Sequence, residues 1–351
     1  MGLGDDLIIA ADRGDLKATQ NCLDKGADIK STDSNGGTAL HGASAGGHNE
    51  IVSLLLSKGA NLSAKDVRGY TSLHAACVCN KTATALLLIE KGAEIKEKTA
   101  EGHTGMFWAV DKGNKDLALA LIDKGGFDIN SREIGSIGLS ALHLASFKGF
   151  AEIVASLLER NASVDLVDDA NGRSALILAS AGGQAKIASL LLDKGANLNL
   201  QATDGATALH LGASAAFSDR RSDVVILLLE KGADATIKDM NGRTALQLAA
   251  VNGRMASTEA LIAKGANLEI QDNEGKTALH LAAQMGHKNI VKLLLNKGSD
   301  INAKDINGSS PLDYANHFGH KAVAELIRKK ARGEDISKSS VAGKIFSFFK
   351  G

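Results

Sequence analysis

The segment Thr38-Ala39-Leu40-His41 decides the fold, because similar segments recur along most of the chain. It returns unchanged at residues 207–210 and 277–280. Related segments, in which Ser or Thr precedes a short apolar run, begin at residues 71, 104, 140, 174, 244 and 310. Successive starts are 33, 33, 36, 34, 33, 37, 33 and 33 residues apart. Self-similarity at this period is typical of stacked repeat proteins.

Each repeat is predicted to contain two short helices. The hydroxyl of Thr38 can accept a backbone N–H at a helix start, and a Gly-rich turn at 46–48 ends a first helix over about 40–45. Residues 51–56 supply the apolar side of a second helix, which Lys58 and Gly59 terminate with a cation and a left-handed residue. One such unit cannot bury its own apolar face, so the units must stack.

The spacing, the Thr-x-Leu-His motif, the Gly-His turn and the segment Ile-Val-x-Leu-Leu-Leu-x-Lys-Gly-Ala at 51–60 resemble the ankyrin repeat. The resemblance covers about residues 5–331 and implies an all-α solenoid of paired antiparallel helices with projecting β-hairpin-like finger loops. We count about ten repeats, which start near residues 5, 36, 69, 102, 138, 172, 205, 242, 275 and 308. Residues 332–351 are expected to form a separate tail, either basic and amphipathic or disordered.

Composition limits the function. The chain has 351 residues, with 40 Lys plus Arg against 40 Asp plus Glu, and this balance argues against binding nucleic acid. Three cysteines, Cys22, Cys77 and Cys79, cannot form a disulfide framework, which indicates a reducing compartment. The sequence shows neither a secretory signal nor a run of about 18 apolar residues. We therefore expect a monomer that is located either in the cytoplasm alone or in both the cytoplasm and the nucleus.

Catalytic, metal and cofactor sites are not predicted. Five of the ten histidines occupy one repeat position, and helices that stack about 8–10 Å apart cannot bring them to one ion. We expect these imidazoles to bond backbone carbonyls instead. Cys77 and Cys79 lack the spacing of a redox or zinc motif and are expected to be core thiols.

Partner-binding residues are predicted from two positions of the repeat. In ankyrin repeats the residue before the cap lies on the finger and faces the concave groove, and a second groove position follows seven residues after the cap. These positions give an apolar centre over repeats three to five and a basic extension over repeats six to nine. The residues at these positions are Tyr70, Val78, His103, Asp111, Leu139, Phe147, Arg173, Arg243 and Lys276. Trp108 is added because it is the only tryptophan and falls on the first helix of the fourth repeat. Alternatively, Trp108 fills a gap between repeats and the cations are ordinary solvated surface.

Two insertions interrupt the period, one in the finger at 126–137 and one around 216–222. Both are candidate binding loops or tolerated changes of length. In the tail, Val341, Ile345, Phe348 and Phe349 share one helical face.

The predicted function is a non-catalytic scaffold or adaptor. Its protein partner is expected to offer an extended segment with hydrophobic anchors and acidic residues. The alternatives are a membrane-recruited adaptor that uses residues 337–351, which is the one predicted site of membrane contact, and an accessory subunit of an enzyme complex.

Overall fold

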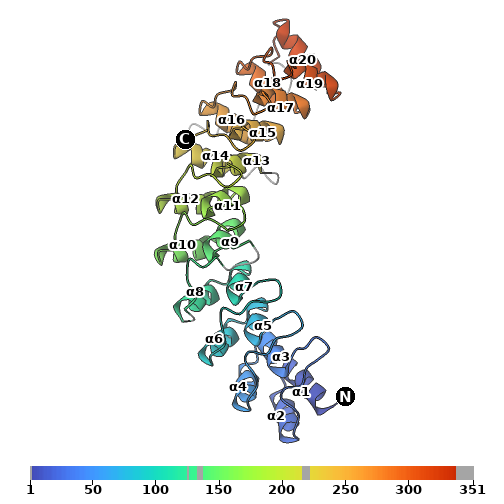
Figure 1. Cartoon of the computed structure of the whole chain (residues 1–351), viewed down its shortest axis with the longest axis vertical. Coiled ribbons are helices and arrows are strands. Elements are labelled where there is room, and N and C mark those ends of the chain that lie inside the picture. Colours follow the sequence, from blue (N-terminus) through green and yellow to red (C-terminus); the bar gives the residue numbers. More distant parts are fainter. Residues whose placement is uncertain (1, 125, 133–136, 216–221, 337–351) are drawn as a thin grey trace. The chain divides into compact units, whose positions relative to one another are not determined.

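A computed structural model describes residues 2–124, 126–132, 137–215 and 222–336. These residues form twenty helices in antiparallel pairs and no named strand (Figure 1). The chain divides into two compact units. The N-terminal unit comprises Met1–Ala179 and Lys186–Asn197, and the C-terminal unit comprises Ser180–Ala185 and Leu198–Gly351. The predicted all-α repeat fold is confirmed.

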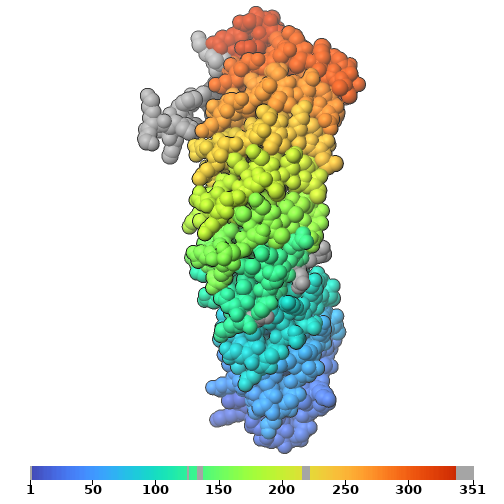
Figure 2. Space-filling model, turned by 60° about the vertical axis from the view of Figure 1, so that its left-hand side comes forward, coloured from blue at the N-terminus to red at the C-terminus, as the bar shows by residue number. Residues whose placement is uncertain are grey.

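The N-terminal unit stacks its helix pairs in chain order. Its helices are α1 (Leu3–Asp12), α2 (Leu16–Asp24), α3 (Ala39–Gly46), α4 (Asn49–Ser57), α5 (Ser72–Val78), α6 (Thr82–Glu90), α7 (Gly105–Asp111), α8 (Lys115–Asp123), α9 (Ala141–Lys148), α10 (Ala151–Glu159), most of α11 (Ala175–Gly182) and of α12 (Ala185–Asp193). The first helices of the pairs pack beside one another from α1 to α9, and the second helices do so from α2 to α10. Within this unit the surface follows the same order from blue to green (Figure 2).

The C-terminal unit repeats this plan. It contains α13 (Ala208–Ser214), α14 (Ser222–Glu230), α15 (Ala245–Val251), α16 (Met255–Ala263), α17 (Ala278–Gln284), α18 (Lys288–Asn296), α19 (Pro311–His317) and α20 (Lys321–Ala331). Helices α13, α15, α17 and α19 form one row, and α14, α16, α18 and α20 form the other. In the described part, no helix combines the length and the apolar character needed to cross a membrane.

Helix boundaries follow local chemistry. Thr71 caps α5 by accepting the backbone N–H of His74, while the His74 ring reaches back to the N–H of Thr71. Helix α3 ends where Gly47 adopts a φ of 84°, a left-handed conformation that favours glycine. The helices predicted from 40–45 and 51–56 are observed as α3 and α4, each slightly longer.

Small side chains let the helices approach closely. Ala43, Ala76 and Ala109 are fully buried at one repeat position, and Leu40 and Leu73 are buried at another. The core is therefore built from interlocking aliphatic groups, which agrees with an aromatic content of only 3%.

The fingers link each pair to the next. Their pairing consists of isolated bridges, Thr32 with Thr38 and Val167 with Ser174, among the described residues. Neighbouring fingers bond through their backbones, since the N–H of Val67 donates to the Asn35 carbonyl at 2.9 Å. The interior of each insertion (133–136 and 216–221) and the tail from 337 to 351 lie outside the described residues.

Candidate functional site

The repeated histidines hold the finger and the next repeat in register. In the second repeat the Nδ1 atom of His41 accepts the N–H of Thr38 at 3.1 Å, so Nε2 carries the proton and donates to the Tyr70 carbonyl at 2.9 Å. His74, His143, His210 and His280 make the corresponding bonds to later carbonyls. Burial lowers the pKa of these four imidazoles. The predicted structural role of the histidines is confirmed.

An aromatic cluster occupies the fingers and first helices of repeats three and four. We define it as Tyr70, His103, Phe107 and Trp108. Tyr70 and His103 each precede a helix cap, and Phe107 and Trp108 lie on α7. The Trp108 ring centre lies 4.8 Å from that of Phe107, 5.5 Å from that of His103 and 6.3 Å from that of Tyr70. The structure thus brings three of the predicted site residues together.

Phe107 is a member of the cluster that the sequence analysis missed. It stands where other repeats carry the bridging histidine, and its ring stacks on His103 at 3.9 Å with an interplanar angle of 13°. Phenylalanine cannot bond to the cap, and the Oγ1 atom of Thr104 is buried without a hydrogen-bond partner in the described structure. The sequence signal for Phe107 was the segment Thr-Gly-Met-Phe at 104–107, which stands where other repeats carry Thr-Ala-Leu-His.

Trp108 combines a partly exposed ring with a buried polar atom. Its Nε1 is inaccessible and has no hydrogen-bond partner among the described residues. Leaving such a donor unsatisfied costs about 1–3 kcal/mol. The ring packs against those of Tyr70, His103 and Phe107, in line with the gap-filling alternative, and remains partly exposed.

Cations surround the aromatic cluster. The Arg68 guanidinium lies 4.8 Å from the centre of the Tyr70 ring, and the Lys112 ammonium lies 5.8 Å from that of Trp108. Their side chains are 71% and 43% exposed. The sequence analysis missed both residues, because neither occupies a predicted groove position.

Asp111 faces the next repeat rather than open solvent. It pairs with Lys148 at 2.7 Å and with Lys112 at 3.6 Å. Burial alone would raise the pKa of Asp111, but the hydrogen bonds and charges of the two lysines lower it overall. Phe147, which precedes Lys148, is 47% exposed. Among the other predicted residues of this unit, Val78, Leu139 and Arg173 are partly exposed.

Arg243 and Lys276 belong to a charged network in the C-terminal unit, which we define as Arg243, Asp272, Glu274, Lys276, Asp305 and Tyr314. Arg243 lies 3.6 Å from the fully buried carboxylate of Asp272, and Lys276 pairs with Glu274 at 2.7 Å. The Lys276 ammonium also lies 5.1 Å from the centre of the Tyr314 ring. Burial alone would lower the pKa of Lys276, but its bond to Glu274 and nearby negative charge raise it overall.

For Lys276, this network contradicts both the predicted basic extension of the groove and the alternative of ordinary solvated surface. Lys276 is buried, with 8% of the residue exposed, because Tyr314 of the next repeat covers it. Its charge and that of Arg243 are balanced within the fold.

The cysteine prediction was partly wrong. Cys22 and Cys77 are buried, and burial raises the pKa of the Cys77 thiol to about 12. Cys79 is exposed, because it caps the end of α5 instead of facing the core.

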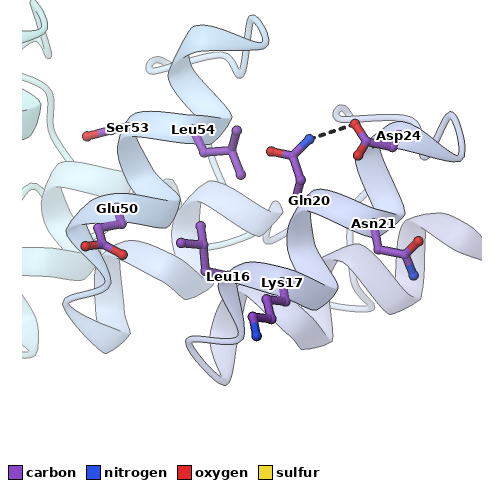
Figure 3. A pocket seen from close by; sticks show the side chains of 8 residues that line it. All are labelled: Leu16, Lys17, Gln20, Asn21, Asp24, Glu50, Ser53 and Leu54. Carbon is purple, nitrogen blue, oxygen red and sulfur yellow. Dashed lines mark hydrogen bonds between the residues drawn. The ribbon is translucent and has the colours of Figure 1, made fainter.

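A shallow groove lies on the second-helix row between α2 and α4 (Figure 3). Leu16 and Leu54 line its apolar part, and Gln20 donates to Asp24 at 2.7 Å. Its polar side chains do not converge on a common point (Figure 3). The arrangement offers no group of residues suited to catalysis.

Comparison with known proteins agrees with this architecture. A family model described as ankyrin repeats (3 copies) matches residues 7–99, 93–168, 142–239, 213–305 and 246–340. A search of curated proteins found no match. The overlapping family matches extend over most of the sequence, so the chain belongs to the ankyrin repeat family.

Proposed function

We propose that this chain is a non-catalytic scaffold or adaptor whose protein partner binds at the aromatic cluster. Ankyrin repeats are generally protein–protein interaction modules and typically lack catalytic activity. The proposal applies this role to the fingers and first helices of repeats three to five. A monomeric state and a cytoplasmic location stay predictions, which light scattering and imaging of the full chain would check.

The observation that carries the proposal is the gathering of four rings on two adjacent repeats. Aromatics make up only 3% of the sequence, and other repeats place Gly37, Ala206 or Ser309 where Tyr70 and His103 stand. Half-buried aromatic side chains in a rigid setting are effective anchors for a partner, because few rotatable bonds are lost on binding.

The surroundings of the cluster define a partner chemistry. Tyr70, Trp108 and the exposed Phe147 suit an extended segment with apolar side chains. Arg68 and Lys112 suit carboxylates that flank those anchors, since their charged ends lie beside the rings. This places the acidic part of the partner next to its hydrophobic anchors, rather than along repeats six to nine.

Affinity capture from source cells with the full chain tests the proposal. The double variant Tyr70→Ala/Trp108→Ala should lose partners that the parent chain retains, with unchanged helical circular dichroism. Met240→Ala is a matched control, because Met240 is a 70% exposed side chain on a finger far from the cluster in sequence. Equal capture by the double variant and the parent chain would refute the assignment.

Binding to the parent chain can also be followed directly. Trp108 is the only tryptophan, so a purified partner that covers the cluster should change the tryptophan emission of the chain. A partner that binds with no change in emission, and whose affinity survives the double substitution, binds elsewhere.

A further inference from the structure

Positive charge gathers on the second helices of the last three repeats, α16, α18 and α20. We define the basic face by six exposed side chains on these helices and directly after them. The residues are Lys264, Lys288, Lys297, Lys321, Arg328 and Lys329. The three helices pack in order as one row of the C-terminal unit, so their exposed sides form one surface (Figure 1).

The repeat register spreads these cations over the surface. Lys288 and Lys321 are the first residues of α18 and α20, and Lys264 and Lys297 directly follow α16 and α18. Because packed helices lie about 8–10 Å apart, cations at equivalent positions of neighbouring repeats are separated by about that distance. On α20 two further cations follow Lys321 by seven and eight residues, which keeps them on its side of the helix and about 12 Å along it.

Carboxylates of the fold do not balance this charge. The five lysines of the basic face form no ion pair with any residue that the structure describes, and Arg328 donates to the neutral side chain of Asn316 at 2.9 Å. Residues 288–297 include no acidic residue. Glu325 is the only acidic residue of 321–332, and it pairs with Arg332 at 3.4 Å. One acidic residue, Glu259, lies on α16.

The second helices of the N-terminal unit balance the same positions. A cation also follows α8 and α10 there, as Lys124 and Arg160. Lys124 pairs with Glu90 at 3.4 Å, and Arg160 pairs with Asp123 at 3.0 Å, each across neighbouring repeats. The eighth and ninth repeats carry Ala and Asn where these two carboxylates stand. The excess charge is therefore a property of the last repeats and not of the repeat fold.

We propose that the basic face binds the surface of an anionic lipid bilayer. A bilayer presents negative charge in two dimensions, so it can meet all six cations at once. Five of the six are lysines, whose flexible point charges suit mobile headgroups, whereas arginine predominates where an anion is bound in a fixed bidentate geometry. This face lies within residues 264–329, and the proposal does not depend on the partner site at the aromatic cluster.

The composition of the helices favours lipid over nucleic acid. Helices α16, α18 and α20 contain no aromatic side chain. Proteins that bind single strands stack the bases on aromatic rings, and the basic face offers none. Reading a duplex requires an element that enters the major groove, but these helices lie side by side in a row. Contact with charged headgroups requires neither feature.

Co-sedimentation of the full chain with vesicles tests the proposal. The chain should bind phosphatidylcholine vesicles that contain phosphatidylserine and should not bind phosphatidylcholine alone. The triple variant Lys288→Gln/Lys297→Gln/Lys321→Gln should bind about 100-fold more weakly, because each lysine near an anionic surface contributes about a fivefold gain. Equal binding by the triple variant and the parent chain would overturn the proposal, since the contact would then lie elsewhere, residues 337–351 included.

A matched variant separates the basic face from net charge. Lys25→Gln/Lys58→Gln/Lys91→Gln removes the same charge from exposed lysines that follow α2, α4 and α6. It should bind the vesicles within about twofold of the parent chain, since a surface charge acts over a screening length of only about 10 Å. A loss as large as that of the first triple variant would show a general charge effect and overturn the proposal.

Salt and competing polyanions complete the test. Raising the salt from about 0.1 M to 1 M shortens the screening length from about 10 Å to 3 Å and should release the chain. Binding that resists this change would indicate insertion of apolar groups and overturn the proposal. Tighter binding of a random-sequence DNA duplex or of polyglutamate at the same salt, lost in the first triple variant, would assign the face to that partner instead of lipid.

Discussion

The aromatic cluster and the charged network occupy the same repeat positions in different units. Tyr70 and His103 precede helix caps in the N-terminal unit, and Arg243 and Lys276 do so in the C-terminal unit. The first pair gathers rings around a tryptophan whose Nε1 has no hydrogen-bond partner in the described structure. The second pair is matched by carboxylates within the fold. A residue that precedes a helix cap is therefore better suited to bind a partner where no charged group of the fold already pairs with it.

The largest expected effect concerns partner binding at the aromatic cluster. Tyr70→Ala/Trp108→Ala should weaken partner binding by about 100-fold or more, because aromatic hot spots contribute about 2–4 kcal/mol each. Isothermal titration with the captured partner measures this loss. Arg243→Ala is the comparison, since Arg243 holds the equivalent position in the network and should leave affinity within about twofold. Similar losses from both variants would remove the distinction between the two regions.

The next effect concerns the contribution of the charged network to the stability of the fold. Lys276→Met should lower the free energy of unfolding by about 1 kcal/mol, because the half-exposed Glu274 loses its ion pair and Tyr314 loses its cation. Urea denaturation measures the loss. Lys304→Met is the control, because Lys304 is 57% exposed and its pair with Asp313 is long at 3.8 Å. A Lys276 variant as stable as the control would show that the network contributes nothing.

A smaller effect depends on pH and separates histidine from glutamine at one position. Gln247 replaces the bridging histidine in the eighth repeat, accepting the N–H of Thr244 at 2.8 Å and donating to the Lys276 carbonyl at 2.7 Å. Burial lowers the pKa of His210, although its bond to the Arg243 carbonyl and the Asp239 charge oppose this. The unfolded chain therefore takes up the proton first, and the His210 contribution is complete above about pH 6.5 and lost as the pH falls below it.

His210→Gln should accordingly lose less stability than the parent chain between pH 7.5 and pH 5. The urea midpoints of the variant and of the parent chain, each measured at the two pH values, give this difference in stability. A variant with the same pH dependence as the parent would show that protonation of His210 does not limit stability.

The smallest expected effect tests the cations around the cluster. Arg68→Ala and Lys112→Ala should each weaken partner binding by about two- to fivefold, because each exposed cation loses an ion pair with a partner carboxylate that contributes about 0.5–1 kcal/mol. They should also reduce the salt dependence of the association rate, which stopped-flow tryptophan fluorescence measures. Lys17→Ala, on the second-helix row, is the control. Faster binding by either variant would contradict carboxylates in the partner.

Much of the site could be predicted because it follows the repeat register. The period placed Tyr70 and His103 on neighbouring fingers and Trp108, the only tryptophan, on the following first helix, and the structure brings the three rings together. Phe107, Arg68 and Lys112 were missed, since their contacts depend on ring orientation and side-chain reach rather than on position in the repeat. Cys79 was placed in the core, although the end of α5 exposes it.

The sequence by itself determined the local structure. A threonine cap and a left-handed glycine act within a few residues, and a bridging histidine reaches a fixed position about 23–29 residues later, so their pattern specifies each helix pair and the register of the stack. Only the tertiary structure decided the environment of individual side chains. Lys276 is buried because Tyr314, 38 residues later, covers it, and Trp108 meets Tyr70 across a repeat boundary. Such contacts join residues about one repeat apart, where local sequence patterns do not fix side-chain orientation.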